Sequence, residues 1–220
     1  MAEKVWKRKK YMLLTVFVLT VYCCVIFQIQ TVKRYVLWFR VCDSMEKEGN
    51  RQDARRLLEE MKCFPVCKMK QTKAPIVFEN GYGQKRTFGG KRCHEGIDII
   101  PVDAAPGEYK ICSVSEGTIE KKGWLPLGGY RIGIRSQEGY YYYYAHLHDY
   151  ANGMQVGKKV KPGEVIGTMG NTGYGKEGTR GKFVVHLHFG IYKEQEKKER
   201  SVNPYYLLKY LSGEDYCRGE

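Results

Sequence analysis

Residues 182–192 read KFVVHLHFGIY, a run rich in β-branched, aromatic and other apolar side chains that is typical of a β-strand. Because successive side chains of a strand point to opposite faces, His186 and His188 are predicted to share one face, with Leu187 on the other. Their Cα atoms would lie roughly 6 to 7 Å apart. One imidazole could bind a metal ion beside the other, and two histidines satisfied by ordinary hydrogen bonds are the alternative.

The same character extends outward from this run. Between about residues 73 and 193, short β-branched or aromatic runs alternate with glycine-rich turns, which predicts an all-β domain. The tyrosines at 140–144 would place three rings on one face of a strand and two on the other, mainly for packing. Near the end, Asn203 and Pro204 precede YYLLKYL and predict the capped start of a terminal helix that docks on the sheet.

Two further clusters hold the remaining histidines. His94 and Asp98 are both suitable zinc ligands, but fully extended they would lie roughly 13 Å apart. Binding one ion therefore needs a bend, which Gly96 permits. His146 and His148 end another strand-like run, and alternation by itself does not decide which of them faces a site. A surface His and a strand-end Asp are the alternative for the first cluster, and exposed histidines for the second.

The N-terminal part has a different character. Residues 11–32 carry no charge and are about long enough for a helix that crosses a hydrocarbon core of roughly 30 Å. We interpret them as a transmembrane helix; a cleaved signal peptide is the alternative, but no small-residue cleavage site follows. The basic residues at 4–10 favour a cytoplasmic N-terminus. Helix formers at 43–61 predict a helical stalk.

Composition limits the range of functions. The 220 residues suit one domain plus an anchor, and a net charge of +13 suits polyanionic surroundings. Nucleic acid is disfavoured as a partner because neither a recognition helix nor an RNA-binding signature accompanies the charge. Cys23 and Cys24 fall in the apolar helix, and the six cysteines that follow could form disulfides whose pairing the sequence leaves open. These six are Cys42, Cys63, Cys67, Cys93, Cys112 and Cys217.

The elements HEGIDI, YAHL and HLHF, in this order, resemble the three signature motifs of the lysostaphin/LytM metallopeptidase family. The similarity continues through GTIE, GGYRIGIR, VKPGEVIGTMGNTG and VNPYYLLKYL, and covers roughly residues 73–211. It implies an antiparallel-sheet peptidase domain with a groove. It also implies a Zn²⁺ ion bound by His94, Asp98 and His188, with His146 and His186 as the catalytic pair. His148 has no counterpart in the motifs.

The resemblance implies a membrane-anchored zinc endopeptidase that hydrolyses peptide bonds of bacterial peptidoglycan outside the cytoplasm. A catalytically silent scaffold or activator, with a protein partner in division or sporulation, is the second hypothesis, although no ligand or catalytic histidine is missing. Stem peptides, direct cross-links and glycine-containing bridges all remain possible substrates. The expected organisation is a cytoplasmic tail, an anchor, a helical stalk, the peptidase domain and a C-terminal tail, at 1–10, 11–32, 33–72, 73–211 and 212–220.

Overall fold

The computed structural model describes residues 2–47, 51–67, 75–87, 89–195 and 198–212. The chain divides into two compact units, Met1–Arg40 and Val41–Glu220. Cys217 and most of the expected C-terminal tail lie outside the described residues, as does the expected boundary at residues 72 and 73.

The first unit is helical. It consists of most of α1 (Ala2–Lys47), whose apolar side chains are exposed all round between residues 11 and 32. Three threonine hydroxyls in this stretch donate to the carbonyl oxygen four residues earlier, so the helix itself satisfies them. A helix that is apolar on every side buries its surface in protein or lipid. By length and composition, α1 is able to cross a membrane, although a signal sequence near an N-terminus would share these properties.

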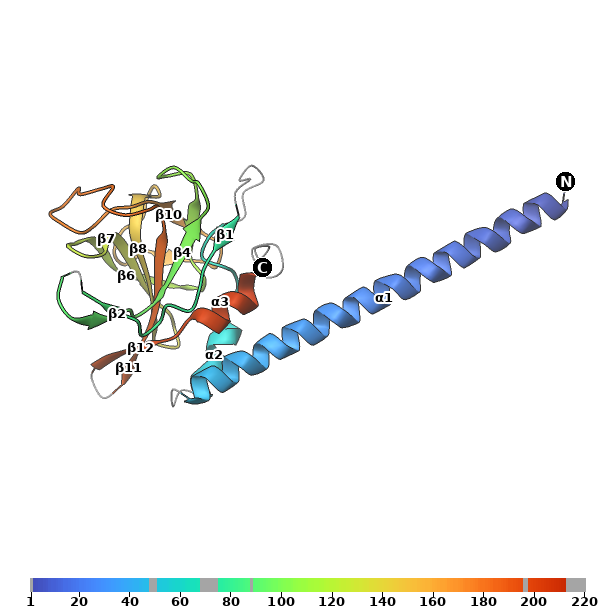
Figure 1. Ribbon diagram of the computed structural model, residues 1–220, viewed down its shortest axis with the longest axis horizontal. Helices are drawn as coiled ribbons and strands as arrows, with labels where there is room; N and C mark the ends of the chain where they lie inside the picture. Colours follow the sequence, from blue (N-terminus) through green and yellow to red (C-terminus); the bar gives the residue numbers. More distant parts are fainter. Residues whose placement is uncertain (1, 48–50, 68–74, 88, 196–197, 213–220) are drawn as a thin grey trace. The chain divides into compact units, whose positions relative to one another are not determined.

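The second unit is built on an antiparallel sheet, as predicted (Figure 1). Its main path runs in the order β1-β4-β11-β8-β7-β6-β9, while β10 pairs with β5 and β8, and β12 pairs with β11. The strands of the main path are β1 (Ile76–Val77), β4 (Ile97–Pro101), β6 (Gly117–Leu125), β7 (Gly129–Arg135), β8 (Tyr140–Tyr150), β9 (Lys159–Val160) and β11 (Leu187–Gln195). The others are β5 (Lys110–Cys112), β10 (Val165–Met169) and β12 (Lys198–Val202), and a separate hairpin pairs β2 (Lys85–Arg86) with β3 (Arg92–Cys93).

The two faces of β8 show how the sheet divides core from groove. Tyr140, Tyr142 and Tyr144 belong to the hydrophobic core, whereas Tyr141 and Tyr143 line a groove on the opposite face. This confirms the predicted division into three rings and two. Because β11 pairs with both β4 and β8, side chains from these three strands lie in adjacent rows on the groove face.

Part of the expected stalk packs on the sheet. In α2 (Arg51–Glu60), Asp53, Ala54 and Leu57 are buried. The Asp53 carboxylate accepts hydrogen bonds from the Tyr140 hydroxyl at 2.6 Å and from Lys193 Nζ at 2.8 Å. A carboxylate is stable in a buried position when it is paired in this way. Residues 51–60 are therefore attached to the domain, and the expected stalk and domain boundaries stay predictions.

The C-terminal helix α3 (Tyr205–Ser212) forms as predicted. Asn203 Oδ1 accepts the backbone N–H of Tyr205 at 3.0 Å, which satisfies one of the donors that a helix start leaves free. Leu207 and Leu208 are buried in the core cluster, so the helix docks through its apolar side.

Candidate metal centre and catalytic groove

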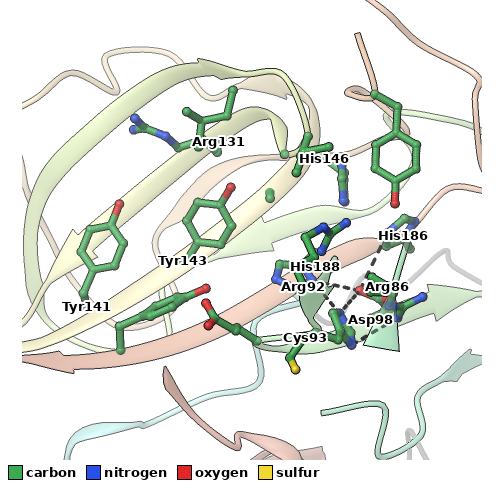
Figure 2. A pocket seen from close by; sticks show the side chains of 18 of the residues that line it. Arg86, Arg92, Cys93, Asp98, Arg131, Tyr141, Tyr143, His146, His186 and His188 are labelled. Atoms are coloured by element: carbon green, nitrogen blue, oxygen red, sulfur yellow. Dashed lines mark hydrogen bonds and ion pairs between the residues drawn. The ribbon is translucent and has the colours of Figure 1, made fainter. Parts of the chain in front are cut away.

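Neighbouring strands bring the predicted ligands together. Asp98 on β4 and His188 on β11 are directly opposite in the sheet register, and His188 is also opposite Ala145 on β8. His94 lies in the turn between β3 and β4 and reaches the same point. The three side chains converge on one point of the groove lining. Figure 2 shows Asp98 and His188 there, with His146 and His186 beside them.

The three ligand atoms form a nearly equilateral triangle. His94 Nε2, Asp98 Oδ1 and His188 Nδ1 are each 3.0 Å from the other two. Around a zinc ion with bonds of about 2.0–2.1 Å, tetrahedral ligand atoms would lie about 3.3 Å apart. The observed triangle is therefore close to one face of such a tetrahedron.

The hydrogen bonds of His94 determine which ring nitrogen faces the cluster. Its Nδ1 lies 2.9 Å from the carbonyl oxygen of Gly81, which can only accept, and 3.2 Å from Arg86 Nη2, which can only donate. With Nδ1 donating in the shorter of these contacts, Nε2 of the neutral ring carries a lone pair. Two ring nitrogens and a carboxylate oxygen thus meet, and the Arg86 guanidinium lies on the far side of the carboxylate, at Oδ2. A divalent cation suits this set, and His, Asp and His are ordinary zinc ligands.

A close backbone approach at Gly96 produces the predicted bend. A Cβ atom at this position would lie 2.5 Å from the carbonyl oxygen of Phe189 and 2.8 Å from the His188 ring. Only glycine fits here without displacing a neighbour. The chain between His94 and Asp98 therefore turns tightly against β11, which brings the two ligands to one point.

Asp98 is held as a carboxylate. Burial would raise its pKa, but the adjoining His188 and His94 imidazoles outweigh that effect and hold the pKa well below its usual range. Arg86 Nη2 donates to Asp98 Oδ2 at 3.0 Å, which leaves Oδ1 for the ligand triangle. Arg86 is not identifiable from the sequence, because a single basic residue in a short hairpin carries no recognisable pattern.

The predicted catalytic pair presents two similar imidazoles to the groove. His146 Nδ1 donates to the carbonyl oxygen of Thr172 at 2.8 Å, and His186 Nδ1 donates to that of Val184 at 2.9 Å. In their neutral forms, both rings therefore carry the lone pair on Nε2. The ring centroids are 4.6 Å apart, and His186 Nε2 is 3.9 Å from Asp98 Oδ1.

Burial keeps both rings neutral. It is the main cause that lowers the pKa of His146 to about 3, and it also lowers the pKa of His186. His146 has a φ of 61°, a left-handed conformation that is costly for a residue with a side chain and that recurs at functional sites. Phe183 packs on both rings, with centroids 4.6 Å from His146 and 5.0 Å from His186.

His148 lies outside this cluster. Its Nδ1 accepts a hydrogen bond from Arg180 Nη1 at 2.7 Å, and its carbonyl oxygen accepts from Nη2 of the same arginine at 3.1 Å. It does not line the groove. An ordinary hydrogen-bonded role fits this position.

The groove that contains the five matched residues has a volume of about 850 Å³. Tyr141 and Tyr143 line it beyond the metal centre, with Arg131 close by (Figure 2). Burial raises the pKa of Tyr143 to about 12, so its phenol stays protonated and adds no negative charge. A cavity of this size, open to solvent, can take several residues of an extended peptide.

An antiparallel β domain with three potential metal ligands and two further imidazoles in one groove is an arrangement typical of a hydrolase. Residues 92–204, more than half of the chain, match the sequence profile of Peptidase family M23, and the chain belongs to this family. This confirms the lysostaphin/LytM resemblance.

Two curated relatives and one solved structure are similar to this chain over the peptidase domain. The L-Ala-D-Glu endopeptidase of Bacillus subtilis (strain 168) is 43% identical over 139 residues, which are 63% of this chain and 41% of that protein. Lysostaphin of Staphylococcus simulans is 32% identical over 131 residues, 59% of this chain and 24% of the relative. A crystal structure described as a glycyl-glycine endopeptidase lytM from Ruminococcus gnavus has a TM-score of 0.68 and 43% identity, and the match covers 75% of this chain and 66% of that one. The chain thus spans less than half the length of these two curated relatives.

Proposed function

We propose that this protein is a membrane-anchored, zinc-dependent endopeptidase that hydrolyses peptide bonds of bacterial peptidoglycan. The observation that carries the proposal is the convergence of three ligand atoms, 3.0 Å from one another, beside two imidazoles with free Nε2 atoms in one groove. Membership of Peptidase family M23 and the names of the relatives support peptidoglycan as the proposed substrate.

His94, Asp98 and His188 would hold the metal in this proposal. When bound, zinc supplies Lewis-acid polarisation of the scissile carbonyl and acidifies water at its open position. The Arg86 guanidinium orients the Asp98 carboxylate by holding Oδ2. Groups that hydrogen-bond to a metal ligand in this way commonly fix the direction in which the ligand points.

His146 and His186 would move the protons. Each is a neutral ring whose Nε2 can accept a proton from the attacking water and later donate one to the leaving amine. The hydrogen bonds from Nδ1 to Thr172 and Val184 fix the tautomer that this role requires. A protonated ring would also stabilise negative charge that develops on the carbonyl oxygen.

Residues 11–32 would anchor the protein, with the basic residues at 4–10 in the cytoplasm and the peptidase domain, at 73–211, outside. Protease added to intact protoplasts should then remove the C-terminal domain. Complete protection until the cells are lysed would contradict this topology. A partner in division or sporulation and a silent scaffold role have no specific observation in their favour, since all five matched residues are present.

The direct test is hydrolysis of isolated peptidoglycan by the zinc-loaded chain in detergent, with products identified by mass spectrometry. We expect new peptide termini that are absent with an Asp98→Ala variant. The position of these termini will identify the bond. If the folded, zinc-loaded protein releases no products from walls of several compositions, the scaffold hypothesis gains support over the enzyme.

A further inference from the structure

Arg131 on β7 lines the groove, and among the described residues no ion pair is seen for its guanidinium. Its Nη1 is enclosed and has no hydrogen-bond partner within the described ranges, although the side chain as a whole is partly exposed. Other cations of the groove are engaged: Arg86 donates to Asp98 at 3.0 Å, and Lys121 Nζ lies 3.9 Å from Glu120. A guanidinium with one N–H enclosed and without an acceptor is unfavourable. Nη1 itself is closed to an incoming group, but Arg131 lines the groove, so a carboxylate bound there would approach the rest of the guanidinium and offset its charge.

The acidic side chains Glu120 and Glu199, near β7, form ion pairs with a different arginine, Arg135. Arg135, four residues further along the same strand, donates hydrogen bonds to Glu120 at 2.6 Å and to Glu199 at 2.7 Å. Two carboxylates thus pair with one arginine at one end of the strand, whereas Arg131 near the other end pairs with no carboxylate in the part of the chain that the structure describes. Arg135 does not line the groove and is a matched control.

The sheet register gives the separation of the strands that carry Arg131 and His188. His188 on β11 is opposite Ala145 on β8, and Arg131 lies where the register of β7 shifts, between partners of Tyr144 and Leu147. With neighbouring strands about 4.8 Å apart, β7 and β11 are roughly 10 Å apart, the length of about three extended residues. A peptide bond positioned at the metal centre would therefore place a residue within three positions of it beside Arg131.

We propose that Arg131 binds a carboxylate of the substrate peptide and that the groove selects peptides with an acidic residue within about three positions of the scissile bond. This inference rests on the proposed function and deepens it. Guanidinium and carboxylate match geometrically and can form two parallel hydrogen bonds. A substrate carboxylate at this place would accept hydrogen bonds from the Arg131 guanidinium, whereas a substrate segment made only of glycine would leave the guanidinium unpaired.

The test compares two stem peptides that differ in one group. One is L-Ala-γ-D-Glu-L-Lys-D-Ala-D-Ala with a free α-carboxylate on D-Glu; the other carries an α-carboxamide there. The zinc-loaded full chain in detergent should hydrolyse the carboxylate form with a kcat/KM about ten- to a hundredfold higher, the range expected for a hydrogen bond to a charged group. Arg131→Gln should reduce this ratio to about one, mainly by slowing the carboxylate form, while Arg135→Gln should keep the wild-type ratio.

The outcomes separate this inference from the proposed function. Equal rates on both peptides for the wild type, or an unchanged ratio in Arg131→Gln, would overturn the role of Arg131 and leave the peptidase standing. Absence of hydrolysis of either peptide and of isolated peptidoglycan would overturn both. If Arg131→Gln does not fold, Arg131→Lys serves instead; it keeps the charge but not the bidentate geometry, and its ratio should fall between one and the wild-type value.

Discussion

His188 on β11 and Asp98 on β4 are a direct cross-strand pair, with Nδ1 and Oδ1 3.0 Å apart. The sheet itself therefore sets the distance between two of the candidate ligands, and only His94 depends on a turn. A ligand set that is mounted on paired strands is already assembled before a metal arrives, which lowers the ordering cost of binding.

Asp98→Ala should sharply reduce zinc content. The substitution removes the anionic ligand and leaves two imidazoles, fewer than the three protein ligands usual for a catalytic zinc site. Metal content after dialysis against a weak chelator, measured by atomic absorption, checks this. Glu95→Ala offers a control because Glu95 lines the groove but is not part of the ligand triangle. Unchanged zinc stoichiometry and affinity in Asp98→Ala would show that the metal site is elsewhere.

His146→Ala and His186→Ala should each retain zinc and lose activity by on the order of a hundredfold or more, because a proton-transfer group is removed while the ligands stay. His148→Ala, whose ring is bound to Arg180 outside the groove, should keep substantial activity. Release of peptides from peptidoglycan, measured together with zinc content and circular dichroism, distinguishes the three. Wild-type turnover by either of the first two variants would remove that histidine from the catalytic pair.

Strand alternation could predict much of this site, and its failure at one residue has a clear cause. Tyr143 and Ala145 line the groove in the regular alternation of β8, so His146 should face the core. Its φ of 61° turns the chain, and His146 also lines the groove. A local departure of this kind leaves no mark on the pattern of apolar residues. The sequence alone therefore left His146 and His148 equivalent, and only the family resemblance separated them.

The two arginines of the site illustrate another limit. Arg86 and Arg131 are two of 37 lysines and arginines, and nothing in their local sequence distinguishes them from solvent-exposed cations. Their roles depend on contacts with Asp98 and on the lack of an acceptor, which are properties of the folded arrangement. Asp53 is similar: it lies among the helix formers at 43–61, which predict only a helical stalk, and its burial against Tyr140 follows from long-range packing.

Acid should destabilise the metal-free protein in part through His146. Its pKa is about 3 in the folded state, against an ordinary value of 6.5, so the unfolded chain binds a proton as the pH falls below 6.5 and the folded chain does not. The stability that this group contributes is complete above that value and is lost progressively between about pH 6.5 and 3. From pH 7 to pH 4.5 we expect a loss of about 2 kcal/mol from this ring.

Urea unfolding of residues 41–220 with a chelator present, at pH 7 and at pH 4.5, measures this loss. His146→Gln, which cannot titrate, should lose less stability over the same interval. An identical loss in the two proteins would mean that the ring is already protonated, or solvated, in the folded state.

Gly96→Ala should weaken zinc binding more than it weakens the fold. The new methyl group would lie 2.5 Å from the carbonyl oxygen of Phe189 and 2.8 Å from the ring of His188, so β11 and the ligand must move. Overpacking of this kind typically costs about 1–3 kcal/mol of stability, and a displaced His188 no longer completes the ligand triangle. Gly153→Ala is the matched control, because it adds a methyl group at a φ of 73° with no atom within 4 Å and so strains the backbone without touching the site. Thermal unfolding and zinc titration of both variants should show a similar loss of stability but a loss of metal affinity in Gly96→Ala alone, and wild-type affinity in that variant would show that the close approach to His188 does not control the metal site.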